Sequence, residues 1–283
     1  MIDKLYIIGN GFDLHHKLKT TYLDFRNYCI SRSPKLHKYL KEAYGDKINS
    51  EMWWCNFEEM LGKVDYLHLM NSYNGMALGS FKVGQLQRNE IPSLFGKWIC
   101  GIDCNIEADF TLDIDVEAQF FTFNYTIVLE NVYGVDKNNV WHIHNSVNDF
   151  KYNKLPVVGH DSDDGDLVKY LSQYRNINYN VRPDIADNIN REIANSAKKV
   201  KNRIYQNEEQ FHKRYSDINH FVCMGFSFNK IDMPYIEKII EVNKCISDTD
   251  WTVYWHSDKE DVCIQDQLFA LGIDKRQIKF VRW

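Results

Sequence analysis

The chain begins with a short apolar stretch that runs directly into a loop containing two glycines. Residues 4–8 are bounded by Gly9-Asn10-Gly11, which is typical of a buried strand at the start of an α/β domain. Glycines in this place let backbone N–H groups approach a phosphate, and the following helix N-terminus favours negative charge. The loop therefore predicts a nucleotide-phosphate site, although Leu14 replaces the third glycine of G-x-G-x-x-G and a tight turn would use the same glycines.

The rest of the chain alternates between strand-like and helix-like segments. Residues 21–99 have mostly helical spacing, and the C-terminal third alternates strands with helices of about a dozen residues. Such alternation implies right-handed βαβ units and a parallel sheet. We therefore expect one α/β domain over residues 1–283, a Rossmann-like parallel sheet flanked by helices, with a helical insertion after the first strand at about residues 30–100. The later strands are expected at residues 118–123, 140–144, 155–160, 220–225, 251–255 and 278–281.

Composition excludes several classes of protein. The formal net charge is -5, so nucleic acid is not an expected partner. No run of about 18 apolar residues exists to span a membrane, and the N-terminal apolar stretch is too short for a signal peptide. Seven scattered cysteines argue for reduced thiols and a cytoplasmic location. The cluster Lys198, Lys199, Lys201 and Arg203 is expected on a solvated helix face.

Polar residues and glycines follow two of the later strands. Asn124 and Thr126 come directly after residues 118–123, while Gly225 and Ser227 end residues 220–225. Ligands of parallel sheets bind at the carboxyl ends of strands, so Asn124 could orient a sugar hydroxyl or a water. The alternative is that Asn124 or Thr126 caps the next helix. Gly225 and Ser227 could contact a second part of a nucleotide, or form a simple βα turn.

Two histidines stand two residues apart in the strand expected at residues 140–144. Strand alternation would place His142 and His144 on one face, and either could serve as a general base near neutral pH. They could instead bind a metal together with carboxylates of the loop 161–166, or form a hydrogen-bonded pair. We expect no tightly bound metal, because two histidines alone rarely form a site.

Together these segments resemble the abortive-infection AbiH family of bacterial phage-defence proteins. They occur in family order and span almost the whole chain. The matching segments are residues 6–14, Thr21-Tyr22 with Phe25, Trp54 with Phe57-Glu58, Phe123–Thr126, Leu129-Glu130, residues 142–144, Gly159-His160, Gly225–Ser227 and Asp232–Tyr235.

The order is more distantly similar to the sirtuin-like NAD-binding fold, and this likeness implies NAD as the ligand. Thr126 replaces the acid of that fold's Thr-x-Asn-x-Asp segment, and Asn145 replaces the glycine of its His-Gly pair. The likeness implies catalytic roles for Asn124 and His144, with His142 as the alternative base. The ligand-binding residues it implies are Gly9, Asn10, Gly11, Phe12, Asp13, Thr126, Gly159, His160, Gly225 and Ser227.

The resemblance implies an anti-phage protein that binds NAD or a related nucleotide and hydrolyses NAD to nicotinamide and ADP-ribose. That reaction passes through an oxocarbenium-like state and needs a held sugar and a positioned water. Two alternatives remain open: a non-catalytic nucleotide sensor, favoured by the missing acid at Thr126, and a metal-dependent hydrolase or nuclease built on His142 and His144. A phage-derived trigger and self-association into a homo-oligomer are also left open.

Overall fold

A computed structural model gives the structure of the chain, which divides into two compact units. It describes residues 2–64, 85, 89–107, 110–150, 152–160, 194, 197–255 and 258–283. The first unit comprises residues 1–20, 99–154 and 200–283, and the second comprises residues 21–98 and 155–199. The predicted insertion at about residues 30–100 thus corresponds to only part of the second unit, which also takes in a later stretch of the chain.

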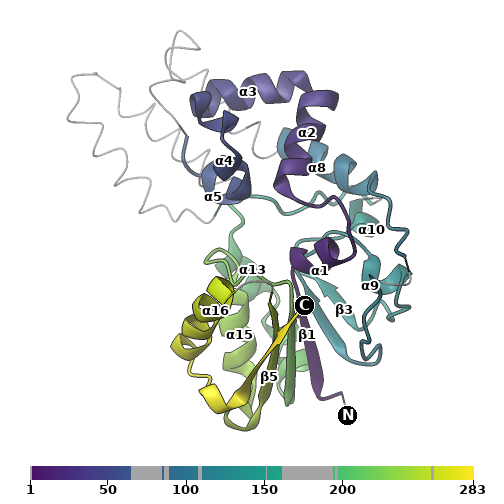
Figure 1. Ribbon diagram of the computed structural model, residues 1–283, viewed down its shortest axis with the longest axis vertical. Coiled ribbons are helices and arrows are strands. Elements are labelled where there is room, and N and C mark those ends of the chain that lie inside the picture. The colour runs from purple at the N-terminus through teal and green to yellow at the C-terminus, as the bar shows by residue number, and fades with distance from the viewer. Residues whose placement is uncertain are drawn as a thin grey trace, which may run out of the picture. The chain divides into compact units, whose positions relative to one another are not determined.

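The first unit is built on a six-stranded sheet in which every pairing is parallel (Figure 1). The order across the sheet is β3-β2-β1-β4-β5-β6, so the chain runs outward in both directions from the β1–β4 pair. The strands are β1 (Lys4–Ile8), β2 (Gln119–Thr122), β3 (Val140–His142), β4 (His220–Met224), β5 (Asp250–Trp255) and β6 (Ile278–Arg282). This is the doubly wound arrangement in which ligands bind where the strand order reverses.

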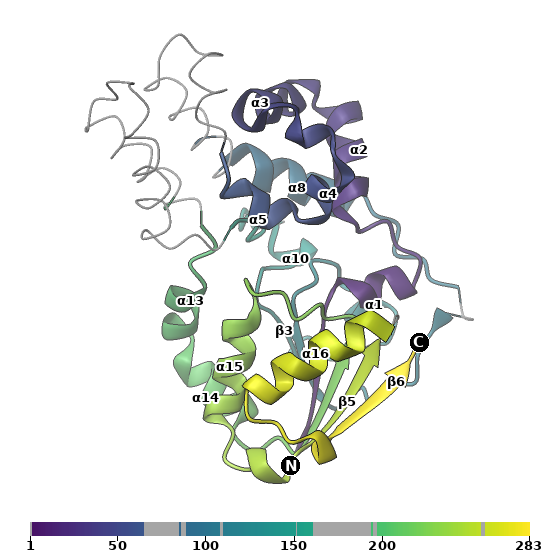
Figure 2. The same ribbon diagram turned by 60° about the vertical axis from the view of Figure 1, so that its left-hand side comes forward.

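Helices cover both faces of the sheet, because the strands are apolar on both sides (Figure 2). One core joins alternate strand residues such as Ile7 and Phe121 to α13 (Val200–Gln206), α14 (Glu208–Tyr215), α15 (Met233–Val242) and α16 (Asp258–Ala270). The other core joins residues such as Tyr6 and Phe120 to α1 (Asn10–His15) and α9 (Val128–Asn131). A short helix, α10 (Val147–Phe150), follows β3.

Six of the seven predicted strands are confirmed, although some are shorter than expected. β3 ends at His142 instead of residue 144. Residues 155–160 form no strand: Val157 and Val158 are buried, but the segment belongs to the second unit and pairs with no strand of the described sheet. An apolar run predicts burial, whereas a strand also needs a neighbouring strand with which to exchange hydrogen bonds.

Three glycines allow the loops after β1 and β4 to touch backbone to backbone. A Cβ atom on Gly9 would lie 2.5 Å from the carbonyl oxygen of Gly225, and one on Gly11 would lie 2.6 Å from the Cα of Gly225. The Gly9 N–H donates to the Met224 carbonyl oxygen (3.0 Å), and the Gly11 N–H donates to that of Gly225 (2.9 Å). Gly225 also has φ +63°, which favours glycine. The glycines therefore hold the two central strand ends together.

We expect Gly11→Ala to lower the free energy of unfolding by about 1–3 kcal/mol, because the added methyl group overpacks a backbone contact that has no room for it. Denaturant unfolding measures the change. Leu14→Ala truncates an exposed side chain of the same helix and should cost less than ~1 kcal/mol. Equal stability of Gly11→Ala and wild type would contradict this account of the loop.

The second unit is helical in its described part. Its first helix begins at a capping box in which Asp24 N–H donates to the Thr21 hydroxyl (3.1 Å) and Thr21 N–H donates to the Asp24 carboxylate (3.0 Å). Aromatic residues fill the core, with Phe25 contacting the rings of Trp54, Phe57, Phe95 and Trp98. The helices are α2 (Tyr22–Arg32), α3 (Pro34–Tyr44), α4 (Glu51–Cys55), α5 (Phe57–Leu61) and α8 (Ile91–Cys100), the last of which ends at the boundary between units.

A buried ion pair joins the two chain segments of the second unit. Lys198 Nζ lies 2.9 Å from Glu58 Oε2, and the side chains are 1% and 11% exposed. The prediction that Lys198 lies on a solvated helix face was therefore wrong, whereas Lys199 and Lys201 are exposed. Spacing could not reveal this, because the buried carboxylate that pairs with Lys198 is 140 residues away.

We expect Lys198→Met to destabilise the chain by about 3–5 kcal/mol, since it leaves the Glu58 carboxylate buried without its counter-charge. The double variant Lys198→Met/Glu58→Leu should regain much of that loss. Lys63→Met removes an exposed ion pair with Glu59 and should cost less than ~1 kcal/mol. Equal losses for Lys198→Met and Lys63→Met in urea unfolding would contradict the role of the buried pair.

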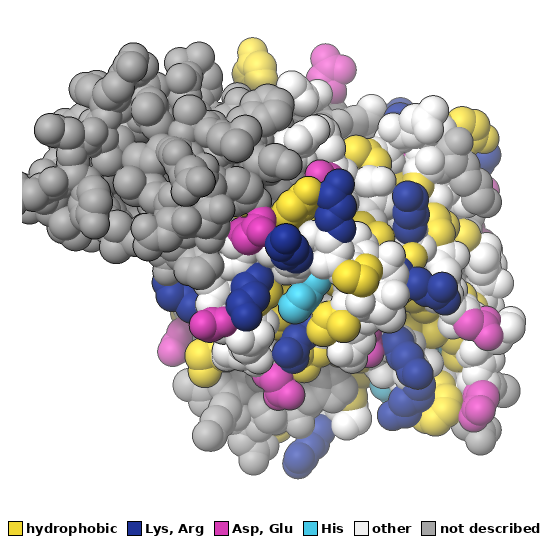
Figure 3. Space-filling view, turned by 90° about the horizontal axis from the view of Figure 1, so that it is seen from above, with side chains coloured by type: hydrophobic (Ala, Val, Ile, Leu, Met, Phe, Trp, Pro, Cys, Tyr) yellow, Lys and Arg dark blue, Asp and Glu magenta, His cyan; other side chains and the backbone are white. Residues whose placement is uncertain are grey.

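Charged side chains of both signs lie on the face of the molecule seen in Figure 3. In Figure 3, Lys and Arg side chains are separated by acidic, apolar and uncharged groups. On α3, Lys38 pairs with Glu42 (3.8 Å) and Lys41 pairs with Asp46 (3.2 Å), which reduces the local positive charge. Among the described residues, no helix is both long enough and apolar enough to cross a membrane.

Candidate functional site

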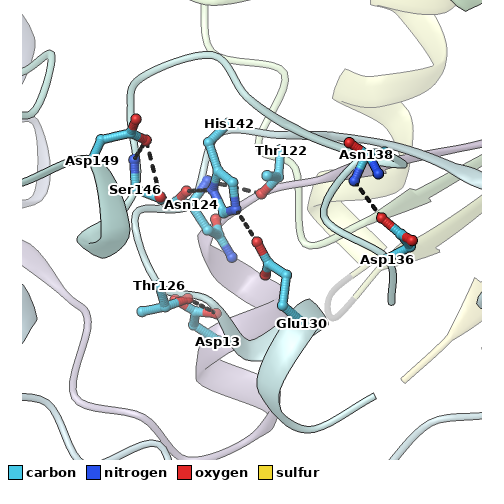
Figure 4. A network of polar contacts seen from close by, with 10 residues as sticks. All are labelled: Asp13, Thr122, Asn124, Thr126, Glu130, Asp136, Asn138, His142, Ser146 and Asp149. Atoms are coloured by element: carbon cyan, nitrogen blue, oxygen red, sulfur yellow. Dashed lines mark hydrogen bonds and ion pairs between the residues drawn. The ribbon is translucent and has the colours of Figure 1, made fainter. Parts of the chain in front are cut away.

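The candidate site lies at the carboxyl ends of four neighbouring strands. Asp13 follows β1, Asn124 and Thr126 follow β2, His142 ends β3 with His144 two residues beyond, and Ser227 follows β4. These strands are adjacent in the order β3-β2-β1-β4, so residues more than 200 positions apart reach one edge of the sheet. Figure 4 shows the polar network around Asn124, with Asp13 and Thr126 beneath it and His142 beside it.

Asp13 is the buried acid of this network. Its side chain is 2% exposed, and the Thr126 hydroxyl lies 3.0 Å and 2.9 Å from its two carboxylate oxygens. Burial raises the pKa of Asp13 from 3.8 to about 7, because the charged form loses its hydration; the Thr126 hydroxyl, the Asn124 amide and the charge of His142 act in the opposite direction. Asp13 therefore exchanges its proton near neutral pH, where an acid–base group is most useful.

Asn124 carries a buried amide that lies beside this acid. The residue is 6% exposed, and its Nδ2 makes no hydrogen bond of normal geometry within the described residues, although the amide is near enough to Asp13 to lower the pKa of that carboxyl. The helix-cap alternative is wrong, because the N-cap of α9 is Ile127 and no side chain caps it. Buried amide groups usually have partners, so Asn124 has hydrogen-bonding capacity that a ligand could use.

His142 has both ring nitrogens engaged. Nδ1 lies 2.8 Å from the Asn124 carbonyl oxygen, and Nε2 lies 2.9 Å from Glu130 Oε1. A carbonyl oxygen only accepts, so Nδ1 carries a hydrogen, and Nε2 faces a carboxylate. Neither nitrogen is available to take a proton from a substrate. His142 therefore positions the Asn124 backbone and is not suited to be a general base.

His144 lies on the opposite side of the sheet from His142, which corrects the prediction that the two share a face. His142 contacts α9 through Glu130, whereas His144 packs against Phe123 (5.6 Å between rings) and Tyr235 of α15 (5.9 Å). The reason is that β3 stops at His142 and the chain turns, with Asn145 at φ +66°. His144 Nε2 lies 3.5 Å from Asp232 Oδ1, so a carboxylate can stabilise its protonated form.

The glycine loop is less open to a phosphate than its sequence suggests. The N–H groups of Gly9 and Gly11 donate to β4 and the loop after it, and the Phe12 N–H donates to the Gly9 carbonyl oxygen (3.0 Å). The Phe12 side chain is fully buried. Asn10 is exposed, and its Nδ2 donates to the Thr20 carbonyl oxygen (3.0 Å). Ser227 is exposed after β4, on the other side of the point where the strand order reverses.

Two predicted site residues, Gly159 and His160, belong to the second unit. His160 is 2% exposed, and its ring packs 3.1 Å from where a Cβ on Gly62 would lie. Its carbonyl oxygen accepts from the Lys198 N–H (2.9 Å), next to the buried Lys198–Glu58 pair. In that unit His160 helps to join two segments of the chain.

The proposed metal ligands are not brought together in the part of the chain that the structure describes. His142 and His144 point to opposite faces, and no group of three or more His, Cys, Asp or Glu side chains among the described residues could hold a metal ion. The acidic loop 161–166 lies outside the described residues.

A family model described as bacteriophage abortive infection AbiH matches residues 5–255. The chain belongs to the AbiH family. The match spans most of the 283-residue chain and confirms the resemblance seen in the motifs, while the sirtuin-like likeness stays a prediction. A search of curated proteins found no match. The motifs Leu129-Glu130 and Asp232–Tyr235, which carry part of the AbiH resemblance, supply the two carboxylates beside the histidines.

Sequence reasoning gave those carboxylates of the AbiH chain no role, and it missed His16. Glu130 follows Thr126 by one helical turn, and Asp232 comes five residues after Ser227; an acid this close behind a strand end was the available signal. The Tyr133 hydroxyl donates to His16 Nε2 (2.5 Å) and accepts from the Leu112 N–H (2.9 Å). The other ring nitrogen, His16 Nδ1, donates to the Phe12 carbonyl oxygen (2.6 Å). This chain of hydrogen bonds anchors α1 beneath the site.

We expect the stability of this AbiH chain to fall as pH rises from about 4 to about 7, because the pKa of Asp13 is raised on folding and the folded state resists its ionisation. Asp13→Asn removes that cost, so its gain in unfolding free energy over wild type should be larger at pH 8 than at pH 5 by roughly 2–3 kcal/mol. Asp136→Asn, at an exposed loop acid, should show no such trend. A gain for Asp13→Asn that is the same at both pH values would contradict the raised pKa.

Proposed function

We propose that this AbiH chain binds NAD at the carboxyl edge of its sheet and hydrolyses it as part of phage defence. In the reaction, the bond between the nicotinamide nitrogen and the ribose C1′ breaks, and a water oxygen bonds to C1′. The products are nicotinamide, ADP-ribose and one proton. Such a reaction needs a held ribose, a positioned water and a group that takes the water's proton.

The observation that carries the proposal is that Asn124, Asp13 and His144 all follow strand ends at the edge where the strand order reverses. The order β3-β2-β1-β4-β5-β6 is the one in which dinucleotides bind across the crevice at that reversal. Residues of β1, β2, β3 and β4 all contribute to this edge. Fold alone does not fix function, so the chemistry of these side chains has to support the proposal as well.

Asn124 suits the task of holding the ribose or the water. Its amide is buried, its Nδ2 lacks a well-formed hydrogen bond within the described residues, and its backbone is fixed by His142 and by the Thr122 hydroxyl, to which the Asn124 N–H is joined at 3.1 Å. A side chain on a fixed backbone loses little entropy when it binds. In the proposed reaction, Asn124 orients the water or a ribose hydroxyl toward C1′.

His144 is the proposed base. Both nitrogens of His142 are engaged, whereas His144 has a carboxylate, Asp232, at 3.5 Å that would stabilise the imidazolium formed when the ring accepts a proton. Phe123, Tyr125 and Tyr235 surround the ring. These contacts support His144, rather than His142, as the proposed base.

The diphosphate of NAD would meet the loops after β1 and β4. Because the N–H groups of Gly9 and Gly11 are used within the protein, the exposed polar residues Asn10 and Ser227 are the proposed contacts, with Gly225 allowing close approach. Thr126 would act through Asp13, to which its hydroxyl is bonded.

We expect the purified protein, incubated with NAD, to release nicotinamide and ADP-ribose in equal amounts by chromatography, with phage components added if a trigger is needed. His144→Ala should lower the rate about 10²–10⁴-fold, the usual contribution of a general base. His220→Ala is the matched control: His220 also pairs with an acid, Asp250 at 2.6 Å, but at the amino end of β4, and its loss should leave the rate unchanged.

Three results would contradict parts of this proposal. If the protein binds NAD but releases no nicotinamide under any condition, it senses the nucleotide and does not hydrolyse it. Full activity of His144→Ala would remove the base from the proposal. Activity that chelators abolish and added divalent metal restores would favour the metal-dependent hydrolase.

A further inference from the structure

We propose that Asp13 is a positioning residue that sets the orientation of the Asn124 amide, and that the Thr126 hydroxyl favours the ionised form of Asp13. This inference deepens the proposed function. Its kinetic test rests on that function, whereas its NMR test does not. It assigns Asp13 a role other than contact with phosphate or ribose. The Asp13 carboxylate is buried and accepts from the Thr126 hydroxyl, and the Asn124 amide lies beside it (Figure 4).

The geometry gives the amide two possible orientations. An ionised Asp13 can only accept hydrogen bonds, so it attracts the NH₂ group of Asn124 and leaves the amide oxygen directed away from it. A protonated Asp13 can donate to that oxygen, which favours the flipped amide. Because the Asn124 backbone is held by His142, the side-chain torsion is the freedom that remains. The state of Asp13 therefore decides whether Asn124 offers an acceptor or a donor to a ligand.

Thr126 favours the ionised form. Its hydroxyl has one hydrogen and lies within 3.0 Å of both carboxylate oxygens, so it donates to the carboxylate. The position is the one at which the sirtuin-like motif would have an acid. Asp13 brings a carboxylate to that neighbourhood from helix α1, which compensates for the threonine at position 126.

Other ionisable groups also face Asp13. His142, with its partner Glu130, comes from β3 and α9 and lowers the pKa of Asp13. Cys104 lies in the segment before β2, and the charge of Asp13 contributes to raising the pKa of its thiol. Burial outweighs the favourable contacts, and the resulting pKa of about 7 means that both states of Asp13 are populated near neutral pH.

The inference predicts a pH dependence of a defined sign. An ionised Asp13 directs the Asn124 oxygen toward the ligand, where it can accept a hydrogen bond from the water or a ribose hydroxyl. NAD turnover should therefore rise with pH through about 7, the pKa of Asp13. Thr126→Val removes the hydrogen-bond donor to the Asp13 carboxylate and so raises the pKa of Asp13. The midpoint of the rise in NAD turnover should therefore move to higher pH by about one unit or more.

The test combines this pH profile with a direct titration of the full-length protein. The ¹³C signal of the Asp13 carboxyl and the side-chain NH₂ signals of Asn124 are followed by NMR from pH 5 to pH 9. We expect both to change with one midpoint, which Thr126→Val raises and Thr126→Ser restores. Asp136→Asn, at an exposed acid of a neighbouring loop, is the control and should leave the midpoint unchanged.

The NMR arm separates this inference from the proposed function. Coupled titration of Asp13 and Asn124 without any turnover of NAD would support the inference and overturn hydrolysis. An Asp13 midpoint near its ordinary value of 3.8, Asn124 signals that do not follow it, or a midpoint unmoved by Thr126→Val would overturn the inference even if the chain hydrolyses NAD.

Discussion

The close contact between the glycine loop after β1 and Gly225 after β4 is the constraint on which the rest of the site depends. It brings together the ends of the two strands from which the sheet extends in both directions. Because the Gly9 and Gly11 N–H groups bind across this contact, α1 begins directly above it. That start point places Asp13 where its carboxylate accepts a hydrogen bond from the hydroxyl of Thr126, which follows β2. A single contact between backbones thus aligns side chains from both halves of the fold.

Around Asn124 the structure separates two pairs of histidine and carboxylate. His142 and Glu130 lie toward α9, and His144 and Asp232 lie toward α15. The first pair fixes a backbone, because its histidine bonds to the Asn124 carbonyl oxygen. In the second pair, the His144 ring packs among Phe123, Tyr125 and Tyr235. Under the proposed function, the first pair would position Asn124 and the second would supply the base.

Much of the fold followed from local patterns in the sequence. Apolar runs alternating with amphipathic segments located six strands of the parallel sheet. What failed depended on partners distant in sequence. Residues 155–160 have the composition of a strand but no strand beside them, and Lys198 resembles a solvated cation but pairs with Glu58 inside a helical core.

The sequence predicted which residues lie at the carboxyl edge of the sheet better than it predicted how they are arranged there. Strand ends identified Asn124 and Asp13, because a parallel sheet gathers such residues at one edge. The sequence could not show that β3 ends at His142. Because the strand stops two residues earlier than expected, His144 lies beyond it and faces the other side of the sheet. Nor could the sequence show that glycine N–H groups are used within the protein, because Gly225 lies more than 200 residues beyond the loop.

The central claim is that the carboxyl edge of this sheet binds a dinucleotide, and backbone amide NMR during titration with ADP-ribose tests it most directly. ADP-ribose contains the ribose and diphosphate of NAD but cannot undergo the reaction. The account predicts that signals of Asn10, Asn124, Asn145 and Ser227 shift together with one saturation curve, while those of Asn219 and Asp250 at the amino edge stay unchanged. Shifts confined to other parts of the chain, or no saturable change at millimolar ligand, would contradict it.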